Sequence, residues 1–125
     1  MLNALSVGFG GCIGAMLRYL LGTSLFQNSH FPYATLLVNV IGAFLMGIPT
    51  QLFAETILIS PRAKLFLTTG LLGGFTTFST FSLETVNLME AGKPIAAFLY
   101  AGFSLALCLA GTFLGKLLVA ALIKG

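Results

Sequence analysis

The residues with the most chemical potential lie in one passage, which begins at Gly70 and reads GLLGGFTTFSTFSLE. Its glycines precede five hydroxyl residues within seven positions: Thr76, Thr77, Ser79, Thr80 and Ser82. A Gly-Gly pair followed by Thr-Thr weakens a helix, so we predict an interruption between Gly73 and Thr76. Freed carbonyls coordinate cations, and the N-terminus of a half-helix faces anions. The alternative is a continuous helix in which Ser and Thr bond back to the carbonyl four residues earlier.

Two phenylalanines stand among these hydroxyl residues. Phe78 and Phe81 are three residues apart, which places them on one face of a helix. An aromatic ring is electropositive at its edge, so two edges facing a polar cavity would attract an anion without trapping it. Conduction needs such weak binding. Ordinary packing is the alternative, as for most of the 12 phenylalanines in the chain.

Three further polar residues are candidates for a site. Asn39 is a lone amide within an apolar segment, where it serves either a pore or the packing between helices. Arg18 lies toward the end of the first apolar segment, from which it either reaches the lipid headgroups or draws anions into a vestibule. Glu84 follows the hydroxyl run and is expected at the mouth of a pore. His30 falls in a polar link and is expected to be solvated.

The composition requires a bilayer around these residues. The chain has 125 residues, of which 58% are hydrophobic and 7% charged, and its mean hydropathy is +1.04. A soluble domain carries roughly a quarter charged residues, so this chain cannot build a surface that faces water. Residues 1–125 are expected to form one multi-pass membrane domain that keeps its first apolar stretch. The few Lys and Arg are scattered, so we expect lipid and no nucleic acid as partner.

Four apolar segments predict an all-α protein with four transmembrane helices. They span about 4–25, 34–53, 65–89 and 95–123, each near the roughly 20 residues that cross a bilayer. The links are short, so successive helices should run antiparallel. The third helix is the one expected to be broken, near the middle of the membrane.

Small residues and charges suggest how the helices assemble. Small-residue stripes follow the first and fourth segments, and they let helices approach closely. One four-helix unit does not need two long stripes, so we predict a homodimer. Arg62, Lys64, Lys116 and Lys124 share one membrane face, and Arg18 and Lys93 share the other. A bias of about two charges is weak enough to permit both orientations.

The motifs together resemble the Fluc (CrcB-type) family of fluoride channels. The run GLLGGFTTFSTF carries most of the resemblance, and GxxGxxxRY from Gly11 to Tyr19 agrees with it. The second and fourth segments add TLxVNxxGxxxxG, from Thr35 to Gly47, and the pair Tyr100 and Ser104. The match covers the whole chain in order. Ala34 and Cys108 depart from the pattern, because many relatives have Gly and some have Ser at these positions.

The resemblance implies a passive fluoride-selective channel in a bacterial plasma membrane, which exports cytoplasmic fluoride. It implies two chains assembled antiparallel, with two pores and one central structural Na+ held by the carbonyls of Gly73 and Thr76. It also implies pore residues: Phe78, Phe81, Asn39, Ser79, Thr80, Tyr100 and Ser104. Arg18 and Glu84 are then candidates for a vestibule.

Other functions agree less well with the sequence. An enzyme is not expected, because the chain has no nucleophile–base pair, carboxylate dyad or metal cluster. Cys12 and Cys108 lack metal-ligand spacing and are expected to be packing residues. A small dual-topology exporter of cationic drugs needs an intramembrane carboxylate, for which Glu84 is the one candidate. A passive assembly subunit, whose polar residues only join helices, would conduct no ions.

Overall fold

The computed structural model describes residues 1–24, 31–55 and 59–124. The described part contains helices and no strands, with three long helices: α1 (Leu2–Ser24), α2 (Tyr33–Glu55) and α6 (Pro94–Lys124). Each is long and apolar enough to cross a membrane. These helices confirm three of the predicted apolar segments. His30 and the link that contains it lie outside the described residues.

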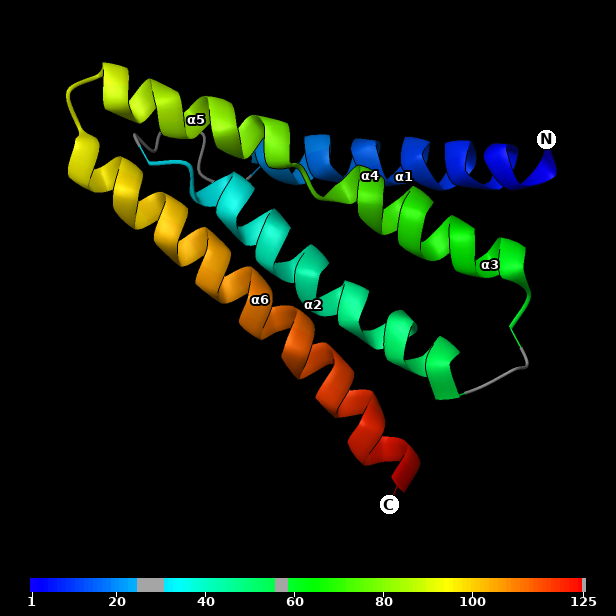
Figure 1. Cartoon of the computed structure of the whole chain (residues 1–125). Coiled ribbons are helices and arrows are strands. Elements are labelled where there is room, and N and C mark those ends of the chain that lie inside the picture. The colour runs from blue at the N-terminus through cyan, green and yellow to red at the C-terminus, as the bar shows by residue number, and fades with distance from the viewer. Residues whose placement is uncertain (25–30, 56–58, 125) are drawn as a thin grey trace.

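The remaining predicted segment is built from several pieces. It begins at Pro61, a turn before the expected residue, as α3 (Pro61–Leu65) and continues as a π-helix, η1 (Phe66–Leu72). The short helix α4 (Gly73–Phe75) follows, and α5 (Phe78–Glu90) completes the segment. Figure 1 shows α4 and α5 as separate ribbons joined by a short extended stretch.

The interruption predicted in this segment is present, two residues beyond the glycine pair. Thr76 (φ −81°, ψ 158°) and Thr77 (φ −150°, ψ 119°) are both extended. Gly73 and Gly74 stay helical, in contrast to the expectation that they would begin the break. Gly74 lies so close to α1 that a Cβ atom would stand 2.6 Å from the Gly11 carbonyl oxygen, so its small size serves packing.

The four membrane segments pack as two pairs. In Figure 1, successive segments run in opposite directions, α1 lies beside the α3–α4 half of the third segment, and α2 lies along α6. Both pairs are therefore parallel. The helix α5 continues past the break and packs on α6. At its end, Gly92 adopts a φ of +71°, which lets the chain turn sharply into α6.

Glycines form both contacts between paired helices. On α1, a Cβ atom at Gly14 would collide with the Leu71 carbonyl oxygen and lie 2.7 Å from the Phe75 nitrogen. On α6, a Cβ atom at Gly115 would collide with the Phe44 carbonyl oxygen of α2. Large parts of both small-residue stripes are thus used within one chain. The packing of these stripes therefore does not require a second copy of the chain.

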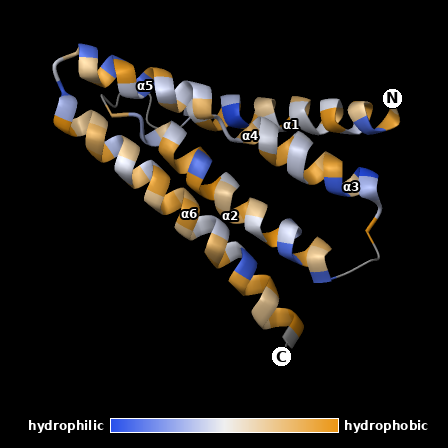
Figure 2. Cartoon of the chain, in the orientation of Figure 1, coloured by the Kyte–Doolittle hydropathy of each residue, from blue (hydrophilic) through white to orange (hydrophobic). Residues whose placement is uncertain are grey.

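The outer surface of the chain is suited to lipid. Large apolar side chains of α1 and α6 are exposed, for example Phe9, Leu105 and Phe113. Figure 2 shows hydrophobic residues along the long helices, whereas hydrophilic residues gather at the start of α3 and at the turn between α5 and α6.

Candidate functional site

The break in the third segment is held open by a side chain from α2. The Asn39 amide donates to the Thr77 carbonyl oxygen at 3.0 Å, and the Thr77 amide donates to Asn39 Oδ1 at 2.8 Å. The amide and the carbonyl of Thr77 both have a hydrogen-bond partner in this way. The Asn39 side chain thus takes the place that a neighbouring strand has in a sheet. The Asn39 amide nitrogen thus donates to the interrupted backbone, and a role of Asn39 in a pore stays a prediction.

The break also changes the surroundings of the two carbonyls assigned to a cation. In a continuous helix, Gly73 would accept from the Thr77 amide and Thr76 from the Thr80 amide. The Thr77 amide bonds to Asn39, and the Thr80 amide donates to Thr77 Oγ1 at 3.2 Å. Both carbonyls thus lose the partner that a helix would give them, and Thr77 caps the N-terminus of α5.

A groove opens beside the break, between α2, α5 and α6. It has a volume of about 590 Å³ and includes four of the residues predicted to line a pore: Asn39, Phe78, Phe81 and Ser104. The Phe78 and Phe81 ring centroids lie 5.3 Å apart. Phe78 is 77% exposed although it belongs to this groove. The groove is therefore open along one side of the single chain.

The other three predicted pore residues lie outside this groove. Tyr100 is fully buried and donates to Glu84 Oε2 at 2.7 Å. Ser79 is exposed, and its Oγ lies 3.3 Å from Thr77 Oγ1. Thr80 lines a second hollow on the other side of the break.

Glu84 is enclosed by hydroxyl groups. Thr35 Oγ1 donates to Glu84 Oε1 at 2.8 Å, and Tyr100 donates to the other carboxylate oxygen. The Tyr100 ring lies between two others, with its centroid 5.2 Å from that of Phe81 and 5.5 Å from that of Phe31. Glu84 lines neither the groove nor the second hollow. A cationic substrate would have to displace hydroxyl groups from both of its oxygens.

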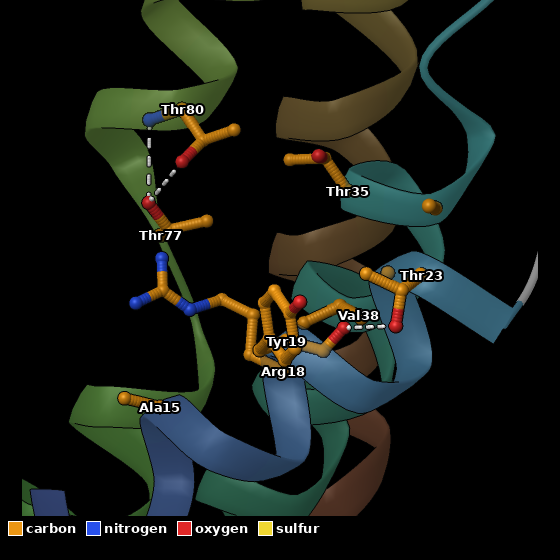
Figure 3. Close-up of a pocket in the computed structure, with 10 residues that line it drawn as sticks. Ala15, Arg18, Tyr19, Thr23, Thr35, Val38, Thr77 and Thr80 are labelled. Atoms are coloured by element: carbon orange, nitrogen blue, oxygen red, sulfur yellow. Dashed lines mark hydrogen bonds between the residues drawn. The ribbon is translucent and has the colours of Figure 1, made fainter. Parts of the chain in front are cut away.

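The second hollow lies between α1, α2 and the start of α5. It has a volume of about 340 Å³ and includes Arg18, Thr35, Thr77 and Thr80. Figure 3 shows the Arg18 guanidinium extended toward Thr77. Thr77 also lines the groove, so the interrupted backbone separates the two hollows. A positive charge at Arg18 would favour anions in this second hollow.

Several residues of the site were missed by sequence reasoning. Thr35 as a partner of Glu84 and Phe31 as a neighbour of Tyr100 had no signal, since both contacts join distant parts of the chain. Thr112 could have been found from the sequence, because it continues the spacing of four residues from Tyr100 through Ser104 and Cys108. It lines the groove, and its hydroxyl donates to the Ala43 carbonyl oxygen at 3.1 Å.

Comparison with known proteins identifies the family. Residues 5–116 match the family described as CrcB-like protein, Camphor Resistance (CrcB). The chain is 49% identical over 120 residues to the "Fluoride-specific ion channel FluC" of Ruminiclostridium cellulolyticum, covering 94% of this chain and 92% of the relative. Proteins of the same name in Clostridium novyi and Rhizobium johnstonii are similar. The first is 48% identical over 120 residues, covering 94% of each chain. The second is 42% identical over 124 residues, covering 98% of this chain and 99% of the relative.

These matches confirm the resemblance drawn from the motifs, and the name that the relatives carry is that of a channel, not an enzyme. With its long apolar helices, the chain is a multi-pass membrane protein. It belongs to the CrcB family.

Proposed function

We propose that this chain is a passive, fluoride-selective channel. The observation that carries the proposal is the groove beside Thr76 and Thr77, where a broken helix, two phenylalanines and a buried hydroxyl come together. The relatives named as fluoride-specific channels support the same substrate. Export of cytoplasmic fluoride follows from passive conduction when fluoride is more concentrated inside.

The chemistry of the groove suits a small anion. The residues that line it carry no charged side chain, so nothing in it would bind fluoride as firmly as a Lys would. Phe78 and Phe81 offer electropositive ring edges, and the α5 N-terminus begins at the same place. Fluoride is small and strongly hydrated, so donors must approach closely to replace its water. A larger anion would fit such donors less well.

Purified protein in liposomes should release fluoride down its gradient without a proton gradient, and should largely exclude chloride. A fluoride electrode and a chloride electrode measure the two effluxes in parallel. Equal rates for the two anions would contradict the selectivity. The absence of fluoride release from folded protein would favour the assembly-subunit interpretation, and proton-driven uptake of a cationic dye would favour the exporter.

We further propose that two chains assemble antiparallel and form two pores. The support is the open side of the groove, because Phe78 exposes most of its apolar ring there. A second chain would cover this side, and the weak charge bias permits the opposite orientation that an antiparallel pair needs. Ser79, Thr80, Tyr100 and Ser104 would then form a polar path, with Arg18 and Glu84 near its entrance.

Adding two Lys residues beside Arg62 should raise the charge bias from about two to about four, drive the chain into one orientation and reduce the yield of active dimers. Arg62 is exposed at the start of α3, so the added charges will not disturb packing. Labelling of single introduced cysteines from either side of the membrane measures the orientation. A single orientation in the unmodified chain would contradict dual topology.

The carbonyls of Gly73 and Thr76 are proposed as ligands of a structural Na+. They fit it because both have lost their helical partners, and oxygen ligands without a carboxylate suit an alkali ion. With two chains, carbonyls of both would converge on one ion. Replacing Na+ by N-methylglucamine in the same liposomes should lower the fluoride flux slowly. A flux unchanged after prolonged exchange would argue against the ion.

A further inference from the structure

One face of α6 carries a side chain with a hydroxyl or thiol group at every fourth residue. Only some of these groups form hydrogen bonds within the chain. The row is Tyr100, Ser104, Cys108 and Thr112. Its two ends are engaged, because Tyr100 donates to Glu84 and Thr112 donates to the Ala43 carbonyl oxygen. The two middle residues both line the groove.

Ser104 has a polar atom without a partner. The residue is only 6% exposed, and its Oγ makes no hydrogen bond with any described residue. A buried hydroxyl without a partner is unfavourable, and most such groups in folded proteins are satisfied. Because Ser104 lines the groove, this oxygen indicates that something polar or charged occupies the space beside it.

Cys108 stands one helical turn after Ser104 on the same face. Its thiol is free and partly buried, and the residue lines the same groove. No Asp, Glu or His lines the groove, so hard divalent cations would find no charged ligand there. A thiolate is the ligand that soft monovalent cations prefer.

We propose that Cys108 and Ser104 form a binding site for a soft monovalent cation of the Cu+ and Ag+ class. The S–H bond of Cys108 breaks, its proton passes to water, an S–metal bond forms, and no electron is transferred. The Ser104 oxygen supplies a second, weaker contact. Both residues belong to one helix, so the site needs no rearrangement of the fold.

Binding at this site inhibits the channel, a consequence that rests on the proposed function. The cation would occupy the groove that Phe78 and Phe81 also line. The Cys108 thiolate and the monovalent cation together carry no net charge, so the bound metal inhibits by filling part of the passage and not by attracting fluoride. Soft metals therefore lower fluoride flux at concentrations where Na+ and Mg2+ have no such effect.

The other cysteine provides the matched control. Cys12 lies on an exposed face of α1, with its Sγ 3.9 Å from Met16 Sδ. This sulfur pair could also take up a soft cation, but it lies outside the groove. Cys12→Ser removes one thiol and leaves the site untouched, whereas Cys108→Ser removes the soft ligand from the site.

The experiment compares the parent, Cys12→Ser and Cys108→Ser in liposomes with AgNO3 in chloride-free medium, since silver chloride is insoluble. Each flux is expressed relative to the same variant without silver. Silver should lower the fluoride flux of the parent and Cys12→Ser by about tenfold or more, reversibly with dithiothreitol, and should spare Cys108→Ser. Equal inhibition of Cys108→Ser, or resistance of the conducting parent, would overturn the site.

A binding measurement separates this inference from the proposed function. In detergent, Ag+ should protect Cys108 of the Cys12→Ser variant from maleimide, as measured by mass spectrometry. Ser104→Ala should weaken this protection several-fold. Protection of Cys108 without any fluoride flux from metal-free protein would support the metal site and contradict the channel function. Fluoride flux without protection would support the channel function and contradict the metal site.

Discussion

Replacing Asn39 by alanine should lower fluoride flux by more than about tenfold and destabilise the folded chain. Asn39 satisfies both the amide and the carbonyl of Thr77. The substitution leaves two partly buried backbone groups without partners, at a cost of about 1–3 kcal/mol each. A change of 1.36 kcal/mol corresponds to about tenfold in a rate, so even a partial effect on the passage is measurable. Liposome efflux and thermal unfolding in detergent measure the two consequences.

Asn39→Asp should reduce the flux still further. It keeps an oxygen for the Thr77 amide but places another oxygen against the Thr77 carbonyl, and it adds a negative charge to the path of an anion. Asn87→Ala is the matched control, because Asn87 is an exposed amide on α5. If Asn39→Ala conducts and unfolds like the parent, the side chain does not hold the break.

Phe78→Ile and Phe81→Ile should each lower fluoride flux by about tenfold or more while the proposed dimer persists. Isoleucine keeps much of the volume but lacks the electropositive ring edge that phenylalanine can offer to an anion in the groove. Phe81 also packs on buried Tyr100, with a centroid distance of 5.2 Å, whereas Phe78 is mostly exposed in the single chain. Phe81→Ile should therefore also lower thermal stability, and Phe78→Ile should affect flux with little change in the stability of the chain.

The control for these substitutions is Phe98→Ile. Phe98 lies on α6, is 70% exposed and is not among the residues that line the groove. Its replacement should leave both flux and stability close to those of the parent. The same flux in all three variants would contradict the prediction that Phe78 and Phe81 line the permeation path.

The membrane segments could be predicted from the sequence, because long apolar runs and short links leave few alternatives to helices in a bilayer. The break was also predictable in kind, since Gly-Gly-Phe-Thr-Thr is a weak stretch of helix. The position of the break was not predictable from the local sequence, because the break lies where Asn39, 38 residues earlier in the chain, bonds to the backbone of Thr77. Nothing in the residues 66–72 distinguishes their π-helix from an ordinary α-helix.

The candidate site was predictable in part. Phe78, Phe81, Asn39 and Ser104 meet at one groove, as their residue types suggested. The partners of polar groups were not predictable, since a sequence does not indicate which hydroxyl reaches which carboxylate. Tyr100 and Glu84 are an example, because both were interpreted as separate pore residues and the structure joins them. The roles assigned to these residues in permeation stay predictions.

The bond between Asn39 and Thr77 has a consequence for biosynthesis. Ribosomes add about 5–20 residues per second, so Thr77 is made about 2–8 s after Asn39, its partner 38 residues earlier. The second segment is therefore available to the insertion machinery before the broken one arrives, and the break enters lipid with its partner already made. A chain with these two segments in the reverse order would present two bare backbone groups to hydrocarbon first. The order of the helices in the gene thus makes the partner of the break available before the break itself.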